Sequence, residues 1–279
     1  MSTAEEITLR IGAYVLIFSL LAAWEIFAPR RTRAIPRAQR WPGNLGILVV
    51  DALCVRVLVP AAAVGAAIFA DEAGIGLFHW MSMPVWIAGI LGFFILDLVI
   101  YAQHVLFHTV PWLWRLHRMH HADTDIDVTT GVRFHPLEII ISMLIKIAVV
   151  LVFGIPAVSV LIFEIVLNAT SMFNHSNARM PERLDRIVRW LVVTPDMHRV
   201  HHSIARHETD SNFGFNLPWW DRLFRTYRAE PEAGHVAMTL GLPIFRDIRE
   251  SRLDRLLTQP FRDEEPASDP HASHATPQT

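Results

Sequence analysis

Long apolar runs constrain this chain more than any other feature of its sequence. Three of them lie at about residues 9–28, 45–70 and 84–107, and each is close to the roughly 20 residues that a helix needs to cross a bilayer. The first run lacks a basic segment before it and a clear cleavage site after it, which predicts a retained membrane helix rather than a signal peptide. Because 52% of the 279 residues are hydrophobic and the mean hydropathy is +0.31, the composition favours a membrane protein.

A fourth apolar region, 137–173, is about twice the usual length of a membrane-spanning helix and is interrupted by Gly154-Ile155-Pro156. Glycine and proline together punctuate a helix, so we expect two helices that form a hairpin. Lys146 and Glu164 lie inside this region. Ionisable groups at membrane depth are costly and usually face protein or water, so we expect both side chains to be turned away from lipid.

Arginine predicts how these helices are oriented. The loop 29–41 carries five arginines, whereas the loop 71–83 carries no lysine or arginine. The positive-inside rule therefore places the first loop in the cytoplasm and the second outside. The third run and the hairpin then return to the cytoplasm, which places every histidine-rich stretch at one membrane face. The expected fold is all-α: a multi-pass membrane helical bundle of about four membrane-embedded units, the last a helical hairpin, with a cytosolic helical histidine-rich cap.

Several classes of function are disfavoured by composition. The formal charge is −2, without the basic stripe that nucleic-acid binding requires. The single cysteine, Cys54, excludes a disulfide within the chain and an iron–sulfur cluster held by its own cysteines. There is no Gly-x-Gly-x-x-Gly fingerprint and no phosphate loop.

Histidine is the unusual residue, with fifteen copies, most of them in short stretches. One pair is spaced by four, and two stretches repeat the spacing His-x-x-His-His, so the members of each stretch share a helical face. The candidate metal ligands are His104, His108, His117, His120, His121, His175, His198, His201 and His202. A neutral imidazole binds iron, copper, nickel or zinc, and nine imidazoles exceed what one metal takes. The pattern therefore suits two metals.

The identity of the metal depends on the reaction. Zinc has no accessible second oxidation state, so iron is favoured if the chemistry is redox. Two other classes remain open at this point. A metal transporter would need ionisable residues along a path through the bilayer, whereas these histidines gather at one face. A zinc hydrolase would need a carboxylate base and far fewer imidazoles.

Some polar residues have two plausible roles. Asp97 lies two helical turns before His104 and is expected either to accept the distal N–H of a metal-bound histidine or to form a polar contact between helices. Asp51 and Arg56, in the second run, are expected to form a structural polar pair.

The histidine stretches and their flanks resemble the fatty acid hydroxylase superfamily, also called the sterol desaturase family. The resemblance runs from about residue 97 to 227 and rests on these segments: Asp97-Leu-Val-Ile-Tyr101-Ala-Gln-His104-Val-Leu-Phe-His108, Leu116-His-Arg-Met-His-His121, Arg133-Phe-His-Pro-Leu-Glu138, Phe173-Asn-His-Ser-Asn177, Thr194-Pro-Asp-Met-His198-Arg-Val-His-His-Ser203, Asp210-Ser-Asn-Phe-Gly214 and Trp220-Asp-Arg-Leu-Phe224. Thr129-Thr-Gly-Val-Arg133 is most similar to the bacterial and alkylglycerol monooxygenase-like branch.

The resemblance implies the nine histidines as ligands of a di-iron centre that uses O2 to attack an unactivated C–H bond. His175 matches a further ligand position, and His135 matches a histidine that is a ligand or lies just behind one in sterol-acting members. Some members carry one more histidine shortly after position 175, and here Asn177 or a water would take that place.

On this basis we expect a membrane oxygenase in a bacterial cytoplasmic membrane, with residues 1–262 as one domain, a catalytic core at about 90–228 and a disordered tail at 263–279. The substrate would be a lipid such as a fatty acyl chain, a sterol or an ether lipid. Hydroxylation is favoured, and desaturation on the same site is the alternative. No fused haem domain is visible in this sequence, so we expect a separate ferredoxin, cytochrome b5-like protein or reductase to supply electrons.

Overall fold

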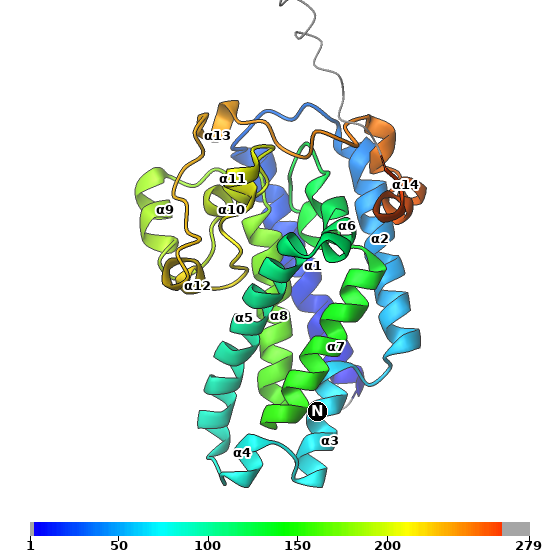
Figure 1. Cartoon of the computed structure of the whole chain (residues 1–279), viewed down its shortest axis with the longest axis vertical. Helices are drawn as coiled ribbons and strands as arrows, with labels where there is room; N and C mark the ends of the chain where they lie inside the picture. Colours follow the sequence, from blue (N-terminus) through cyan, green and yellow to red (C-terminus); the bar gives the residue numbers. More distant parts are fainter. Residues whose placement is uncertain (1–2, 264–279) are drawn as a thin grey trace, which may run out of the picture.

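The computed structural model describes residues 3–263, and in that range the chain is helical with no strand. Figure 1 shows a lower bundle of long helices and, above it, a cap of short ones. The tail expected at 263–279 lies outside the described residues except for Asp263, which forms an ion pair with Arg115 at 2.7 Å.

The bundle contains α1 (Thr3–Phe27), α2 (Arg37–Leu58), α3 (Ala62–Ala73), α4 (Leu77–Trp80), α5 (Val85–Thr109), α7 (Pro136–Phe153) and α8 (Ala157–Asn174). The cap contains α6 (Pro111–His121), η1 (Thr130–Val132), α9 (Glu182–Val188), α10 (Pro195–His201), α11 (Arg206–Thr209), α12 (Trp219–Leu223), α13 (Gly234–Ala237), η2 (Ile248–Ser251), α14 (Leu253–Thr258) and η3 (Gln259–Phe261). Five stretches are long and apolar enough to cross a membrane, which confirms the expected multi-pass helical bundle.

The second apolar run differs from its prediction because it forms two helices. α2 ends at Leu58 and α3 begins at Ala62, on either side of Pro60. Proline lacks the N–H that would continue the helix and clashes with the preceding turn. Ala62 also has a positive φ of 48°, so the chain changes direction before α3. Together α2, α3 and α4 make up a single candidate span, Arg37–Trp80.

The predicted hairpin is confirmed. α7 ends where Gly154 adopts the left-handed conformation (φ 68°), and α8 begins immediately after Pro156. The two helices pack against α3 and α5 around Leu96, Val150 and Phe163. On α3 the packed face is a row of alanines, which lets helices approach closely where lipid removes the hydrophobic driving force.

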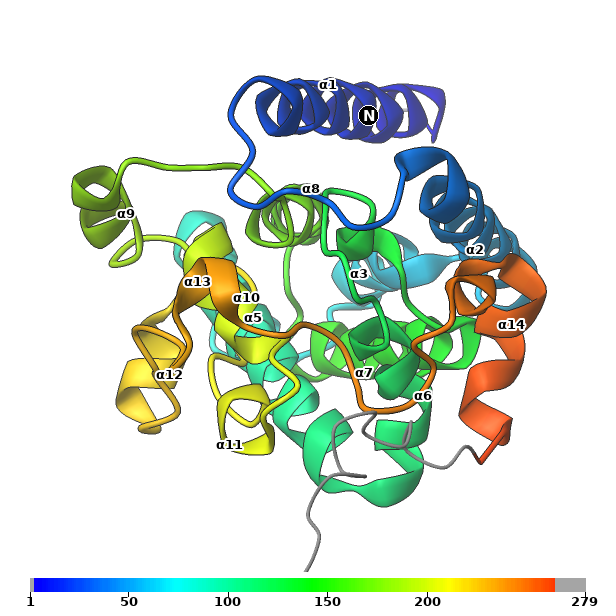
Figure 2. The same cartoon turned by 90° about the horizontal axis from the view of Figure 1, so that it is seen from above.

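The histidine-bearing segments meet at one end of the bundle, as expected. α5 and α8 rise to that end, and α6 and α10 lie there in the cap (Figure 1). Seen from above in Figure 2, α1 lies at the rim of the bundle, where it packs on α8.

A buried arginine fixes the loop that follows the histidines of α6. Arg40 of α2 is 0% exposed and donates to both oxygens of Asp123, at 3.0 and 2.6 Å, and to Asp127 at 2.8 Å. Arg40 and Arg133 hold the pKa of the Asp123 carboxyl well below its usual range, although burial opposes this. The loop is thereby attached to α2, and its position sets the position of His120 and His121.

We predict that Arg40→Met destabilises the protein by about 3–5 kcal/mol, because two buried carboxylates lose their nearest cation. Thermal unfolding in detergent measures this change. Arg252→Met is the matched control, since the Arg252–Asp254 pair is exposed at both side chains and contributes little. Equal melting temperatures for the two variants would contradict the role assigned to Arg40.

Candidate metal centre

Three helices, with the residue that directly follows α8 and the one that directly follows α10, supply the nine candidate histidines. His104 and His108 lie one turn apart at the end of α5, and α6 begins with Pro111 just after it. α10 is capped by Thr194, whose Oγ1 accepts from the Met197 N–H, and begins with Pro195. His175 follows the last residue of α8. Short helices with defined starts therefore aim the rings of α6 and α10 at the ends of α5 and α8.

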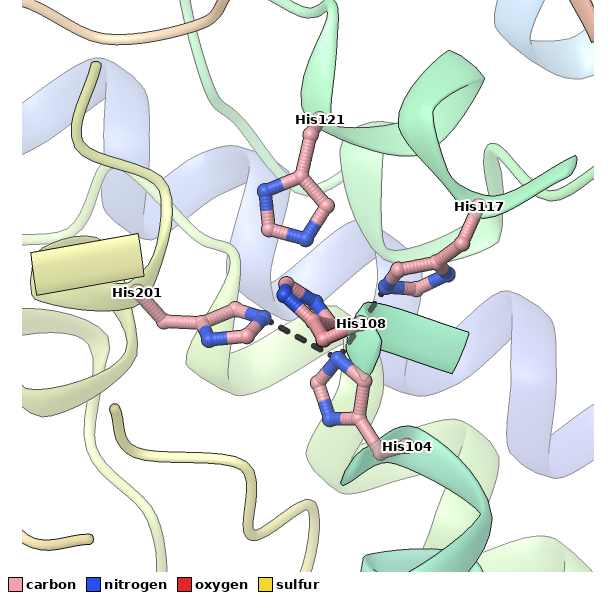
Figure 3. A group of neighbouring side chains, drawn as sticks. All are labelled: His104, His108, His117, His121 and His201. Atoms are coloured by element: carbon pink, nitrogen blue, oxygen red, sulfur yellow. Dashed lines mark hydrogen bonds between the residues drawn. The ribbon is translucent and has the colours of Figure 1, made fainter. Parts of the chain in front are cut away.

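The nine histidines form two adjacent groups, and each of them is at most 3% exposed. The first group is His104, His108, His117, His121 and His201, shown in Figure 3. The second group is His120, His175, His198 and His202. Within each group, nitrogen atoms from all members lie within 4.8 Å of one another. α6 and α10 contribute to both groups, because the i+3 and i+4 positions of each stretch point to different neighbours.

Hydrogen bonds orient five of these rings. Nδ1 of His104, His201 and His175 lies 2.7 Å from the carbonyl oxygens of Phe213, Ser211 and Ser171 respectively. Nδ1 of His120 lies 3.0 Å from the carbonyl of Arg133, and Nδ1 of His117 lies 2.7 Å from Glu138 Oε1. A carbonyl oxygen only accepts, so Nδ1 of His104, His120, His175 and His201 carries the proton and Nε2 carries a lone pair. An ionised Glu138 gives His117 the same tautomer.

The free nitrogens then face one another at short range. His104 Nε2 lies 3.1 Å from His117 Nε2 and 3.0 Å from His201 Nε2, the two contacts drawn in Figure 3. His175 Nε2 lies 3.0 Å from His120 Nε2. With the proton of each ring on Nδ1, these contacts bring lone pair against lone pair. A cation between them removes the repulsion.

Other ring nitrogens are buried without any hydrogen-bond partner. These are both ring nitrogens of His108 and of His202, Nε2 of His121 and Nδ1 of His198. Buried polar atoms are almost always satisfied, so orphaned imidazole nitrogens beside converging lone pairs fit a metal. The residues present therefore suit two metal ions.

The nitrogen spacing allows one cation to contact both rings of each pair. At a bond length of about 2.1 Å, two neighbouring nitrogens on one metal ion are about 3.0–3.4 Å apart. The observed contacts are 3.0 and 3.1 Å.

Burial keeps the cap histidines neutral, as metal binding requires. It lowers the pKa of His117 to about 3 and that of His175 to about 4. Burial and the neighbouring rings also push the pKa of the other five well below the usual histidine value; these are His120, His121, His198, His201 and His202. The lone pairs are therefore available at neutral pH.

The three remaining sequence candidates lie outside both groups. His135 caps α7: its Nδ1 accepts from the Leu137 N–H, and its Nε2 lies 3.3 Å from the Leu257 carbonyl. Asp97 accepts from Trp220 Nε1 at 2.8 Å, so of its two expected roles the structure shows the polar contact between elements.

Asn177 is occupied by the loop after α1. Its Nδ2 donates to the Arg31 carbonyl at 2.8 Å, and its Oδ1 accepts from the Arg31 N–H at 3.0 Å. Its amide therefore does not take the place of a missing ligand. The expected Asp51–Arg56 pair is also absent from the described residues, where Asp51 Oδ1 is buried without a hydrogen-bond partner. Both side chains line the cavity described below.

Glu138 is the residue that sequence reasoning missed. It lies in the first turn of α7, is 5% exposed, and accepts from His117. A carboxylate behind a ligand fixes the ring and raises its basicity. The sequence feature that could have revealed Glu138 is its position as an isolated acidic residue at the start of an apolar run, three residues after His135.

Aromatic rings shield the two groups. Phe134 stacks on His120 at 4.5 Å between centroids, and Phe215 lies 5.0 Å from His104. A cavity of about 930 Å³ begins beside these rings, lined there by His104 and His117 and elsewhere mainly by apolar residues. Pockets of this size hold small organic ligands.

Comparison with known proteins agrees with this site. A family model described as fatty acid hydroxylase matches residues 89–226, about half of the chain and the part that contains every histidine of both groups. This chain belongs to the fatty acid hydroxylase family.

Three relatives illustrate the range of the family. Ornithine lipid hydroxylase OlsE of Rhizobium tropici is 30% identical over 53% of this chain and 44% of its own. Human alkylglycerol monooxygenase is 26% identical over 61% of this chain and 36% of its own. Cholesterol 25-hydroxylase of Rattus norvegicus is 25% identical over 49% of this chain and 45% of its own. The chain thus spans less than half of each relative's length, and no solved structure gives a significant match.

We predict that the metal-free protein loses stability as the pH falls below about 6.5. In the unfolded chain each histidine takes up a proton there, whereas the folded pKa values lie lower, so acid favours unfolding down to those values. The melting temperature in detergent should fall by several degrees per pH unit between pH 6.5 and pH 5. A melting temperature that stays level or rises over this interval would contradict neutral, buried imidazoles.

Proposed function

We propose that this protein is a membrane-bound non-haem di-iron oxygenase that hydroxylates a C–H bond of a lipid. The observation that carries the proposal is the convergence of unprotonated Nε2 atoms in two adjacent buried groups. Two of these histidines also line a large, mainly apolar cavity. A site of this kind places two redox metals beside a space for hydrocarbon.

The overall reaction balances with an external reductant. A lipid C–H, one O2, two electrons and two protons give a lipid C–OH and one water. When bound, the two irons would supply the redox chemistry that activates O2. The electrons would come from a separate ferredoxin, cytochrome b5-like protein or reductase, which this proposal places at the cap.

The chain's own residues bind, orient and exclude water. The carbonyls of Phe213, Ser211 and Ser171 and the Glu138 carboxylate hold the rings in one tautomer and one direction. Phe134 and Phe215 keep water from the ring nitrogens. The cavity fixes which carbon faces the centre, and an error of about 1 Å in that placement lowers the rate steeply.

Three alternatives predict other features. A desaturase uses the same site and differs only in removing a second hydrogen, so its product distinguishes it. A transporter needs ligands that exchange with water, whereas these nine are buried and five are held by Nδ1 hydrogen bonds. A zinc hydrolase needs fewer imidazoles and a tetrahedral open site. The number and the burial of the converging imidazoles support the redox centre against the last two.

We predict that His201→Ala and His120→Ala each lower the metal content from two per chain to one or none. Each variant loses one converging lone pair from a different group. Hydroxylation should fall on the order of 100-fold or more, as even residues behind a ligand matter 10–100-fold. Metal analysis and O2 uptake with a lipid extract measure both effects.

The matched control is His135→Asn, which removes a nearby imidazole outside both groups and keeps a side chain able to cap α7. It should retain two metals and most of the activity. Two metals per chain in both alanine variants, or full activity in either, would defeat the ligand assignment.

We also propose that the cap faces the cytoplasm of a bacterial cell. The arginine-rich segment 29–41 lies at the cap end, and the segment 71–83 at the other end has no lysine or arginine. A green fluorescent protein fused to the C-terminus should fluoresce, and alkaline phosphatase fused at the same place should be inactive. An active phosphatase fusion together with a non-fluorescent green fluorescent protein fusion would contradict this orientation.

A further inference from the structure

The cavity contains charged side chains that the proposed oxygenase reaction leaves without a role. Lys146 Nζ donates to Glu164 Oε1 at 2.7 Å, and Arg10 Nη2 donates to Glu164 Oε2 at 2.8 Å. Arg10 Nε also donates to Glu6 Oε1 at 2.8 Å. All four residues line the cavity, although they belong to membrane-embedded helices α1, α7 and α8. We call them the charged end of the cavity.

The charged end lies far from the histidines. Lys146 follows Glu138 by eight residues on α7, which places it about 12 Å further along the helix axis. Glu138 is hydrogen-bonded to His117 of the five-histidine group. The cavity therefore has a metal-binding end near Glu138 and a charged end near Lys146.

The cavity opens toward lipid near the break between α2 and α3. Its lining includes Pro60 and Ala61 of the break and Ile7 and Ile11 of α1, all of them exposed. Near the cap, α1 and α2 are joined through the aromatic contact Phe18–Trp41. A molecule in the bilayer therefore reaches the charged end first.

Stability alone is a weak reason for these charges. The network does tie α1 to the hairpin through Glu164. However, charges inside a membrane-embedded helix are expensive and mark binding sites by default, and a buried ion pair is often no more stable than apolar residues in its place. Because these charged side chains line a cavity, they are also placed to bind a ligand.

The open donors select the ligand. Glu6 and Glu164 offset the charges of Arg10 and Lys146, and Arg56 and Asp51 also line the cavity. Both oxygens of Glu164 are used. In the described part of the chain no residue accepts from Arg10 Nη1 or from the other two Lys146 N–H groups. The two cations at this end of the cavity therefore present open N–H donors to an anionic oxygen group.

We propose that Arg10 and Lys146 bind the carboxylate or phosphate of a single-chain lipid whose hydrocarbon chain runs along α7 toward His104 and His117. The inference rests on the proposed function, because it makes this lipid the substrate. It places the reacting C–H in the chain, about 12 Å or more from the anionic group.

Photolabelling of the full-length protein in phosphatidylcholine nanodiscs tests the orientation without turnover. One probe is hexadecanoic acid with a diazirine in the second half of its chain, and the other has the diazirine beside the carboxylate. The first should label peptides containing Phe134 or Phe215, and the second should label peptides of α1 or of α7 around Lys146. The methyl ester of each probe, which lacks the charge, should label about tenfold less.

Variants test the two cations. Lys146→Met and Arg10→Gln should each reduce labelling by the acid about tenfold and leave labelling by the ester unchanged, whereas Lys146→Arg should retain it. Competition by unlabelled hexadecanoic acid or hexadecyl phosphate shows which anion binds more tightly. Two metals per chain in every variant would show that the centre itself is intact.

Equal labelling by the acid and its ester on the wild-type protein would overturn the proposal, and this comparison needs no variant. An exchange of the two labelling sites would overturn it as well. Labelling requires no O2 or electrons. Failure here would therefore leave the oxygenase proposal standing, and correct labelling without hydroxylation would count against the oxygenase alone.

Discussion

The structure depends on imidazole lone pairs that point at one another. Five rings give their Nδ1 proton to an oxygen, and three pairs of Nε2 atoms are then left facing each other at 3.0–3.1 Å. Such an arrangement costs free energy unless a cation lies between the rings. Two metal ions account for these contacts and for one unpartnered nitrogen on each of His108 and His202, while burial and the neighbouring rings keep the His202 ring neutral.

The rest of the fold holds this arrangement together. The hairpin carries His175 back to the end of α5, and the ion pairs of Arg40 fix the loop after α6. Glu138 connects the metal centre with the cavity. Its carboxylate orients His117 for a metal, and its place on α7 marks where the cavity begins. One helix therefore joins the metal centre to the charged end, where Lys146 lies.

Local sequence patterns made much of the fold predictable. Run lengths and Gly154-Ile155-Pro156 predicted the spans and the hairpin, and arginine placement predicted that the histidines meet at one end. The division into groups of five and four was not predictable, because spacing shows which rings share a face but not which faces meet. Contacts distant in sequence were missed for the same reason: Glu138 with His117, and Asp97 with Trp220, 123 residues away. The break at Pro60 was overlooked although the proline is visible in the sequence.

The central claim is tested most directly by anomalous diffraction at the iron absorption edge from crystals of the protein purified with its metal. The account predicts two strong peaks per chain, one among the five histidines around His104 and one among the four around His175. A single peak, or peaks confined to the partly exposed cluster of His207, Glu208 and Glu232, would contradict it.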